Sequence, residues 1–196
     1  PYPEILPGAS PQLARATDSL SLLIVAYPKG LSPAQKKILT VPNTNMVLDG
    51  PYVAGVVLEK EMNAGRVETN EKSLEKLRSA WTAAREFDRA VAVIDQLAPM
   101  KPDGELYVQK AQLMMEKGQW DGVIAAAEQA LEKGGLKKPG GAYLMIGIAG
   151  TELERWDVAR EALNEAKRVG NDTTRRQAAD WLTFVEDRRQ VAMASN

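Results

Sequence analysis

The sequence contains no cysteine and no histidine among its 196 residues. Without cysteine, disulfides, thiolate chemistry and the usual zinc sites are excluded. Without histidine, the chain lacks the commonest general base and a common metal ligand. We therefore expect neither a metal site nor a cofactor.

The sequence also lacks a large excess of either positive or negative charge, and it has no long apolar run. The 25 basic and 26 acidic residues give a net charge of −1, so nothing electrostatic indicates a nucleic-acid partner. The longest apolar run, residues 22–27, is far too short to span a bilayer, and we expect no direct membrane insertion. The hydrophobic fraction of 44% is enough for a real core. Because the sequence opens with Pro1 rather than Met, we expect a processed product or a fragment.

Motifs for catalysis are weak. Ser73 and Lys76 spell the S-x-x-K pattern of some acylating hydrolases, but its partner motifs are missing. A surface serine in the first turn of a helix is the favoured interpretation. The aspartates and glutamates are scattered and indicate solvated helix faces. The sequence therefore predicts no catalytic residue and no enzyme activity.

The stretch 105–131, ELYVQKAQLMMEKGQWDGVIAAAEQAL, indicates two short antiparallel helices. Apolar residues recur at helical spacing on both sides of a turn at Gly118, a residue suited to positive φ. A lone hairpin cannot bury both apolar stripes, so it needs neighbours of its own kind. Similar patterns occur 36 residues later and 33 residues earlier, which is typical of a helical repeat array. The corresponding positions are Tyr107, Ala111, Trp120, Val123 and Ala130, then Tyr143, Gly147, Trp156, Ala159 and Ala166, and earlier Leu74, Arg78, Phe87, Ala90 and Leu97.

This order of aromatic and small residues resembles the tetratricopeptide repeat (TPR). The resemblance implies an all-α fold of TPR-type helical hairpins that forms a right-handed superhelix with a C-terminal capping helix. We predict five hairpin-like units, of which the first two are irregular. We predict an irregular or degenerate repeat region at 1–50, a TPR array at 51–172 and the capping helix at 173–191. Predicted helices are 12–27, 34–41, 51–62, 71–84, 87–97, 105–116, 120–131, 142–153, 156–169 and 174–191. Asn70, Asp103, and Asp172 or Thr173 are predicted caps, and a long connection is expected from Gly134-Gly135 to Gly140-Gly141.

First helices line the concave face of a TPR array, so residues there that the hairpin core does not use are candidates for binding a partner. Their apolar, methionine-bearing character suits a peptide or helix in a groove. The competing interpretation, that the C-terminal helix covers them as ordinary core, stays open. The predicted groove residues are Val108, Gln112, Met115, Leu144, Met145, Ile148 and Glu152.

A narrower resemblance covers residues 50–190. It depends on GPYVAGVVLEKEMNAGRVETNEKSLEKL, GELYVQKAQLMMEKGQWDGVIAAAEQALEKGGLKKPGGAYLMIGIA and RRQAADWLTFVED. These segments resemble the gammaproteobacterial TPR proteins encoded beside TonB–ExbB–ExbD energy-transduction genes. The resemblance implies a periplasmic adaptor for nutrient or iron-complex uptake, with a TonB, ExbB or ExbD component as protein partner.

Two other functions stay open. One is a generic TPR adaptor in envelope assembly or secretion. The other is a structural module in which the apolar stripe mediates self-association, so a homo-oligomer is also possible.

Overall fold

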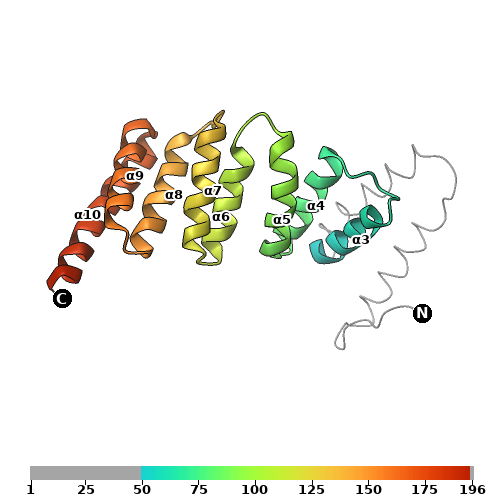
Figure 1. Ribbon diagram of the computed structural model, residues 1–196, viewed down its shortest axis with the longest axis horizontal. Helices are drawn as coiled ribbons and strands as arrows, with labels where there is room; N and C mark the ends of the chain where they lie inside the picture. The colour runs from blue at the N-terminus through green and yellow to red at the C-terminus, as the bar shows by residue number, and fades with distance from the viewer. Residues whose placement is uncertain (1–49, 195–196) are drawn as a thin grey trace. The chain divides into compact units, whose positions relative to one another are not determined.

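The computed structural model describes residues 50–194, and every element in that range is a helix (Figure 1). The all-α prediction is therefore confirmed for this part of the chain, whereas the helices predicted at 12–27 and 34–41 lie outside the described residues. The chain divides into two compact units, residues 1–90 and 91–196. The elements are α3 (Pro51–Asn63), α4 (Glu71–Ala83), α5 (Phe87–Leu97), a 3-10 turn η1 (Ala98–Met100), α6 (Glu105–Glu116), α7 (Trp120–Lys133), α8 (Pro139–Glu152), α9 (Trp156–Val169) and α10 (Asp172–Ala194).

The first unit is built around Trp81 on α4, whose side chain is completely buried. Tyr52 on α3 meets the indole edge-on, with ring centroids 5.8 Å apart. The Arg89 guanidinium lies 4.5 Å from the indole centroid, in cation–π geometry. Gly55 allows α3 to approach this closely, because a Cβ there would lie 2.6 Å from an indole carbon. Trp81 therefore determines how α3 and α4 pack.

The connection between α3 and α4 encloses one charged group. Glu61 is buried, with 3% of its surface exposed. Arg66 donates hydrogen bonds from its guanidinium to both carboxylate oxygens of Glu61. The backbone N–H groups of Arg66 and Val67 also donate to the Glu61 carbonyl. Paired in this way, the buried carboxylate is compensated and fixes the chain as it leaves α3.

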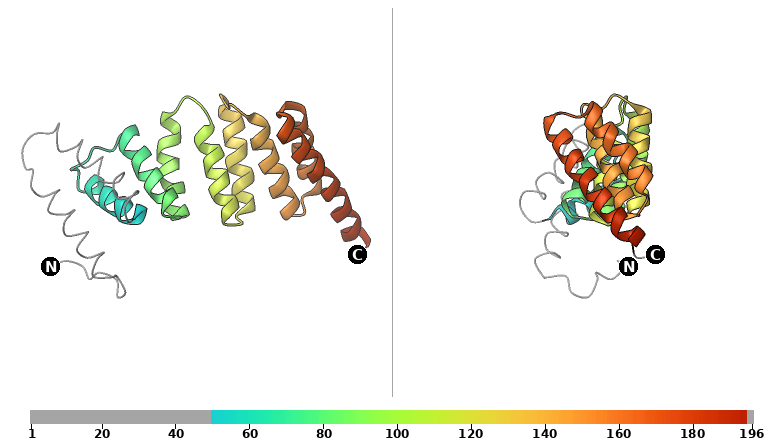
Figure 2. Two further views of the ribbon diagram at one scale, coloured as in Figure 1. Left: turned by 180° about the vertical axis from the view of Figure 1, so that it is seen from behind. Right: turned by 90° about the vertical axis from the view of Figure 1, so that its left-hand side faces the viewer.

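In the second unit each helix packs on the next, from α6 through α7, α8 and α9 to α10. Figure 2 shows α6 to α9 standing side by side in chain order. The first helices of successive hairpins, α6 and α8, also contact each other, and α10 contacts α8 as well as α9. The small residues at the helix crossings, Ala111, Ala159 and Ala166, are completely buried, as the repeat pattern predicts.

Three hairpin turns share one geometry. A residue with positive φ stands two positions before the aromatic residue that opens each second helix, at Arg85, Gly118 and Glu154. The next residue donates its N–H to the carbonyl five positions back, for example Gln119 to Met114 at 3.0 Å. This bonding satisfies the last carbonyls of each first helix. The prediction at Gly118 is confirmed, and the same conformation at Arg85 and Glu154 was not predicted.

The connection before α8 is shorter than predicted. Gly134 and Gly135 have positive φ and belong to it, but Gly140 and Gly141 lie inside α8, which begins at Pro139. Pro139 occupies the first turn of the helix, where its missing N–H costs nothing. The prediction that α8 starts at residue 142 was therefore wrong by one turn.

The caps agree in part with prediction. Asn70 accepts the Ser73 N–H and completes a reciprocal capping box with the Ser73 side chain. Asp103 accepts the Glu105 N–H at 3.1 Å, one residue before the cap position of α6. At α10 the predicted cap was wrong, because the Asn171 side chain accepts the Thr174 N–H at 2.9 Å. Asparagine before a helix satisfies an unpaired N–H as well as aspartate does.

Within residues 50–194 no helix combines the length and apolar character needed to cross a membrane. The division into 1–50, 51–172 and 173–191 and the handedness of the superhelix stay predictions.

Candidate functional site

The seven residues predicted to line a binding groove come from α6 and α8, and the structure exposes only some of them. Gln112 and Glu152 are exposed, while the others are half-buried or buried. Met145 belongs to a core cluster that Val108 and Met115 also pack against. The two helices are in contact, so the seven residues lie on neighbouring elements. The list is Val108, Gln112 and Met115 on α6, and Leu144, Met145, Ile148 and Glu152 on α8.

The terminal helix covers part of this predicted groove. Leu144 packs against a cluster that includes Ala178 and Val185 of α10. Leu144 is itself half-buried, and the same cluster also contains Ala159 and Leu163 of α9, so the interpretation that α10 makes the groove residues ordinary core stays open. Ile148 is half-buried, and its role in binding stays a prediction.

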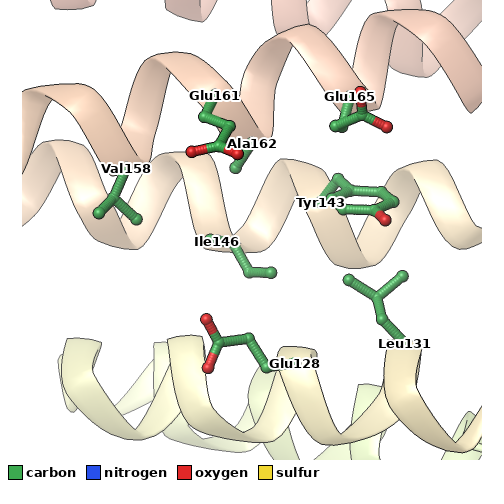
Figure 3. A pocket seen from close by; sticks show the side chains of 8 residues that line it. All are labelled: Glu128, Leu131, Tyr143, Ile146, Val158, Glu161, Ala162 and Glu165. Carbon is green, nitrogen blue, oxygen red and sulfur yellow. The ribbon is translucent and has the colours of Figure 1, made fainter.

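A hollow of about 540 Å³ opens elsewhere, between α7 and α9 with α8 beneath it (Figure 3). Its apolar surface comes from all three helices, and three glutamates stand around it. None of the seven predicted groove residues lines this hollow. We call it the α7–α8–α9 pocket; its lining residues are Glu128, Leu131, Tyr143, Ile146, Val158, Glu161, Ala162 and Glu165.

The pocket lies on the opposite side of α8 from the predicted groove. Tyr143 and Ile146 are three residues apart and share one face of the helix. At about 100° per residue, Leu144, Ile148 and Glu152 point roughly the other way. The hairpin array therefore presents a hollow on the side formed by its second helices, α7 and α9.

The three glutamates differ in their electrostatics. Arg168 donates hydrogen bonds to Glu165, the shortest at 2.7 Å. These bonds hold the pKa of the Glu165 carboxyl below its ordinary value. Glu128 and Glu161 have no hydrogen-bond or ion-pair partner among residues 50–194. Figure 3 shows them reaching into the hollow from opposite helices, across Ile146, so two negative charges remain uncompensated there.

Replacing Arg168 by glutamine is expected to raise the pKa of Glu165, because the charged hydrogen bonds that favour the carboxylate are lost. In the native chain the ion pair is present at neutral pH and is lost as the pH falls through the lowered pKa. An NMR titration of the Glu165 side-chain carboxyl measures the change. Lys167→Gln removes a neighbouring exposed cation and should leave this pKa in place. An unchanged pKa in Arg168→Gln would contradict the assignment.

Neither the possible metal ligands nor the serine of the S-x-x-K pattern forms a reactive site in the described residues. Among the described residues no three His, Cys, Asp or Glu side chains are placed to hold a metal ion. Ser73 of the S-x-x-K pattern is buried, not on the surface as expected, and its hydroxyl donates to the Glu68 and Asn70 carbonyls. The burial follows from its role in the capping box of α4. This serine is therefore part of a helix start.

Sequence reasoning did not find the pocket. Glu128, Glu161 and Glu165 each resemble an ordinary solvated residue on its own helix, and Val158 resembles a stray exposed apolar residue. Only the packing of α7 and α9 on α8 brings them together. A weak signal was available, because Val158, Glu161 and Glu165 recur at helical spacing on one face.

No protein-family model matches the chain, and a search of curated proteins also gives no match. Solved structures of MamA do resemble it. The structure "MamA RS-1 ArsTM double mutant" has a TM-score of 0.62 and 17% identity, over 82% of this chain and 87% of that one. "MamA 41-end from Desulfovibrio magneticus RS-1" has a TM-score of 0.55 and 16% identity, over 83% of this chain and 98% of that one.

A further MamA structure, from AMB-1, has a TM-score of 0.56 and 15% identity over 81% of this chain. At such identities the likeness concerns the fold alone. The all-α fold of TPR-like helical hairpins is thereby confirmed. The chain therefore shares the fold of these MamA structures, a stack of TPR-like helical hairpins.

Proposed function

We propose that this chain is a non-enzymatic scaffold that binds protein partners through the surface of its helical repeats. The observation that carries the proposal is the α7–α8–α9 pocket, whose apolar and acidic side chains come from three helices that pack on one another. A partner side chain inserted there would be held by both apolar contact and charge.

More specifically, we propose a periplasmic adaptor of a TonB-type energy-transducing system for nutrient or iron-complex uptake. The support is the sequence resemblance over residues 50–190, with its hairpin phrases and the linker EKGGLKKPG. The partner would then be TonB, ExbB or ExbD.

Self-association is the alternative that a specific observation favours. The terminal helix α10 leaves Phe184, Val191 and Met193 exposed, at 43%, 67% and 68% of their surfaces. Exposed apolar residues on the last helix of a repeat array offer a surface on which another copy can pack.

Photo-crosslinking in the cells that the protein comes from tests these proposals together. A photoreactive residue at Val158, which is 39% exposed at the pocket, should give a discrete adduct with a partner protein. A probe at Ile148 tests the predicted groove, and Lys137, exposed between α7 and α8, is the control site.

The identity of the adduct separates the alternatives. TonB, ExbB or ExbD peptides from Val158 support the specific proposal, and another envelope protein supports a generic adaptor. Two copies of the chain joined through a probe at Phe184 support self-association. An adduct from Ile148 alone contradicts the assignment to the pocket, and no adduct from any probe contradicts the scaffold itself.

A further inference from the structure

We propose that the α7–α8–α9 pocket receives an arginine side chain of the protein partner. This inference rests on the proposed scaffold function and adds the chemistry of recognition. The observation behind it is that the carboxylates of Glu128 and Glu161 line the hollow and have no cationic partner among residues 50–194. Two like charges around one hollow repel each other, and a single cation between them removes that repulsion.

The third glutamate does not compete for this cation. Glu165 is already bonded by Arg168, so its charge is largely compensated within the chain. The uncompensated charge is therefore centred on Glu128 and Glu161, which Figure 3 places on opposite sides of Ile146. A positive group that enters the hollow would meet these two carboxylates and the apolar side chain of Ile146.

The side chains that line the pocket favour an organic cation over a metal ion. The described residues hold no group of three or more acidic or other ligating side chains placed for a metal ion. The lining is mixed, because Leu131, Ile146 and Val158 contribute apolar surface beside the glutamates. A ligand must therefore bring methylene groups as well as charge, and long basic side chains do so.

Arginine fits better than lysine. Its planar guanidinium carries five donors in a fixed fork and can bond two carboxylates at once. It also stacks on aromatic rings, and Tyr143 lines the same pocket. An ammonium group, by contrast, is a compact and strongly hydrated point charge.

The direct test titrates the ¹⁵N-labelled chain of 196 residues with a short capped peptide that carries one arginine between two leucines. The matched peptide carries citrulline, which has the same shape without the charge. We expect the arginine peptide to shift the amide signals of Ile146, Glu161 and Ala162, and the citrulline peptide to bind at least tenfold more weakly. Added salt should weaken the arginine peptide alone, since the rim is exposed to solvent.

Single substitutions test whether the pocket carboxylates bind the arginine. Glu128→Gln and Glu161→Gln should each weaken the arginine peptide about tenfold, the effect of losing one charge-assisted hydrogen bond. Glu132→Gln, which removes an exposed charge of α7 outside the pocket, should bind like the native chain. Equal binding of the arginine and citrulline peptides overturns the inference, as does native binding by the double variant Glu128→Gln, Glu161→Gln.

The arginine inference can fail while the scaffold proposal holds, and the crosslinking experiment distinguishes the two cases. A Val158 adduct whose linked segment contains no arginine, together with equal peptide binding, overturns the arginine inference and leaves the scaffold in place. A linked segment with an arginine whose replacement by glutamine removes the adduct supports both.

Discussion

Replacing Trp81 by alanine is expected to lower the free energy of unfolding by about 3–5 kcal/mol, the typical cost of truncating a large buried aromatic residue. The indole is completely buried between α3 and α4 and has Tyr52 at its edge and Arg89 over its face. Alanine leaves a cavity and removes both contacts. The loss is measured by urea unfolding followed by far-UV circular dichroism, and hydrogen exchange should quicken first in α3 and α4.

Two control variants test whether the loss of stability is specific to the buried indole of Trp81. The indole Nε1 is buried without a hydrogen-bond partner among the described residues, so Trp81→Phe loses no hydrogen bond and should cost less than alanine. Phe184→Ala removes an aromatic residue that is 43% exposed on α10, and about 1 kcal/mol is expected from its edge contact with Trp181. Equal losses for Trp81→Ala and Phe184→Ala would contradict the role given to Trp81.

The repeat pattern predicts most of the fold because it consists of aromatic and small residues at fixed, short spacings along the chain. Aromatic residues such as Trp120 and Trp156 mark where second helices open, and both helices begin at these residues. The left-handed turn residue was predicted only at Gly118, where glycine indicates it. Arg85 and Glu154 adopt the same conformation, although it is unfavourable for residues with a side chain. There the packing of the two flanking helices determines the conformation, so the residue type carries no signal.

The candidate pocket could not be predicted in the same way, because its residues come from three helices. Glu128 on α7 and Glu161 on α9 are 33 positions apart, and neither is unusual on its own helix. Their shared hollow depends on how α7 and α9 pack against α8. Periodicity identifies which face of a single helix is apolar. It does not give the distance between the exposed faces of α7 and α9.

The start of α8 provides the second large expected effect, from two adjacent glycines that sequence reasoning placed in a connection. A Cβ on Gly140 would lie 2.5 Å from the Cα of Gly170 and 3.0 Å from its nitrogen, whereas a Cβ on Gly141 would meet nothing within 4 Å. Backbone atoms cannot rotate away, so Gly140→Ala should force α8 away from the turn between α9 and α10 and cost about 1–3 kcal/mol. Gly141→Ala should instead stabilise the helix by about 0.5–1 kcal/mol.

Urea unfolding of the two alanine variants and the native chain measures both changes in the free energy of unfolding. The two changes are expected to have opposite signs, which separates the explanations that follow. A general cost of altering this segment would make both variants less stable, and a general preference of helices for alanine would make both more stable. Only a contact specific to residue 140 separates them. Gly141, which was predicted to lie in a long connection, would then be a helical position with free space for a side chain. Its neighbour Gly140 would be the position where the backbone of α8 meets the backbone of Gly170.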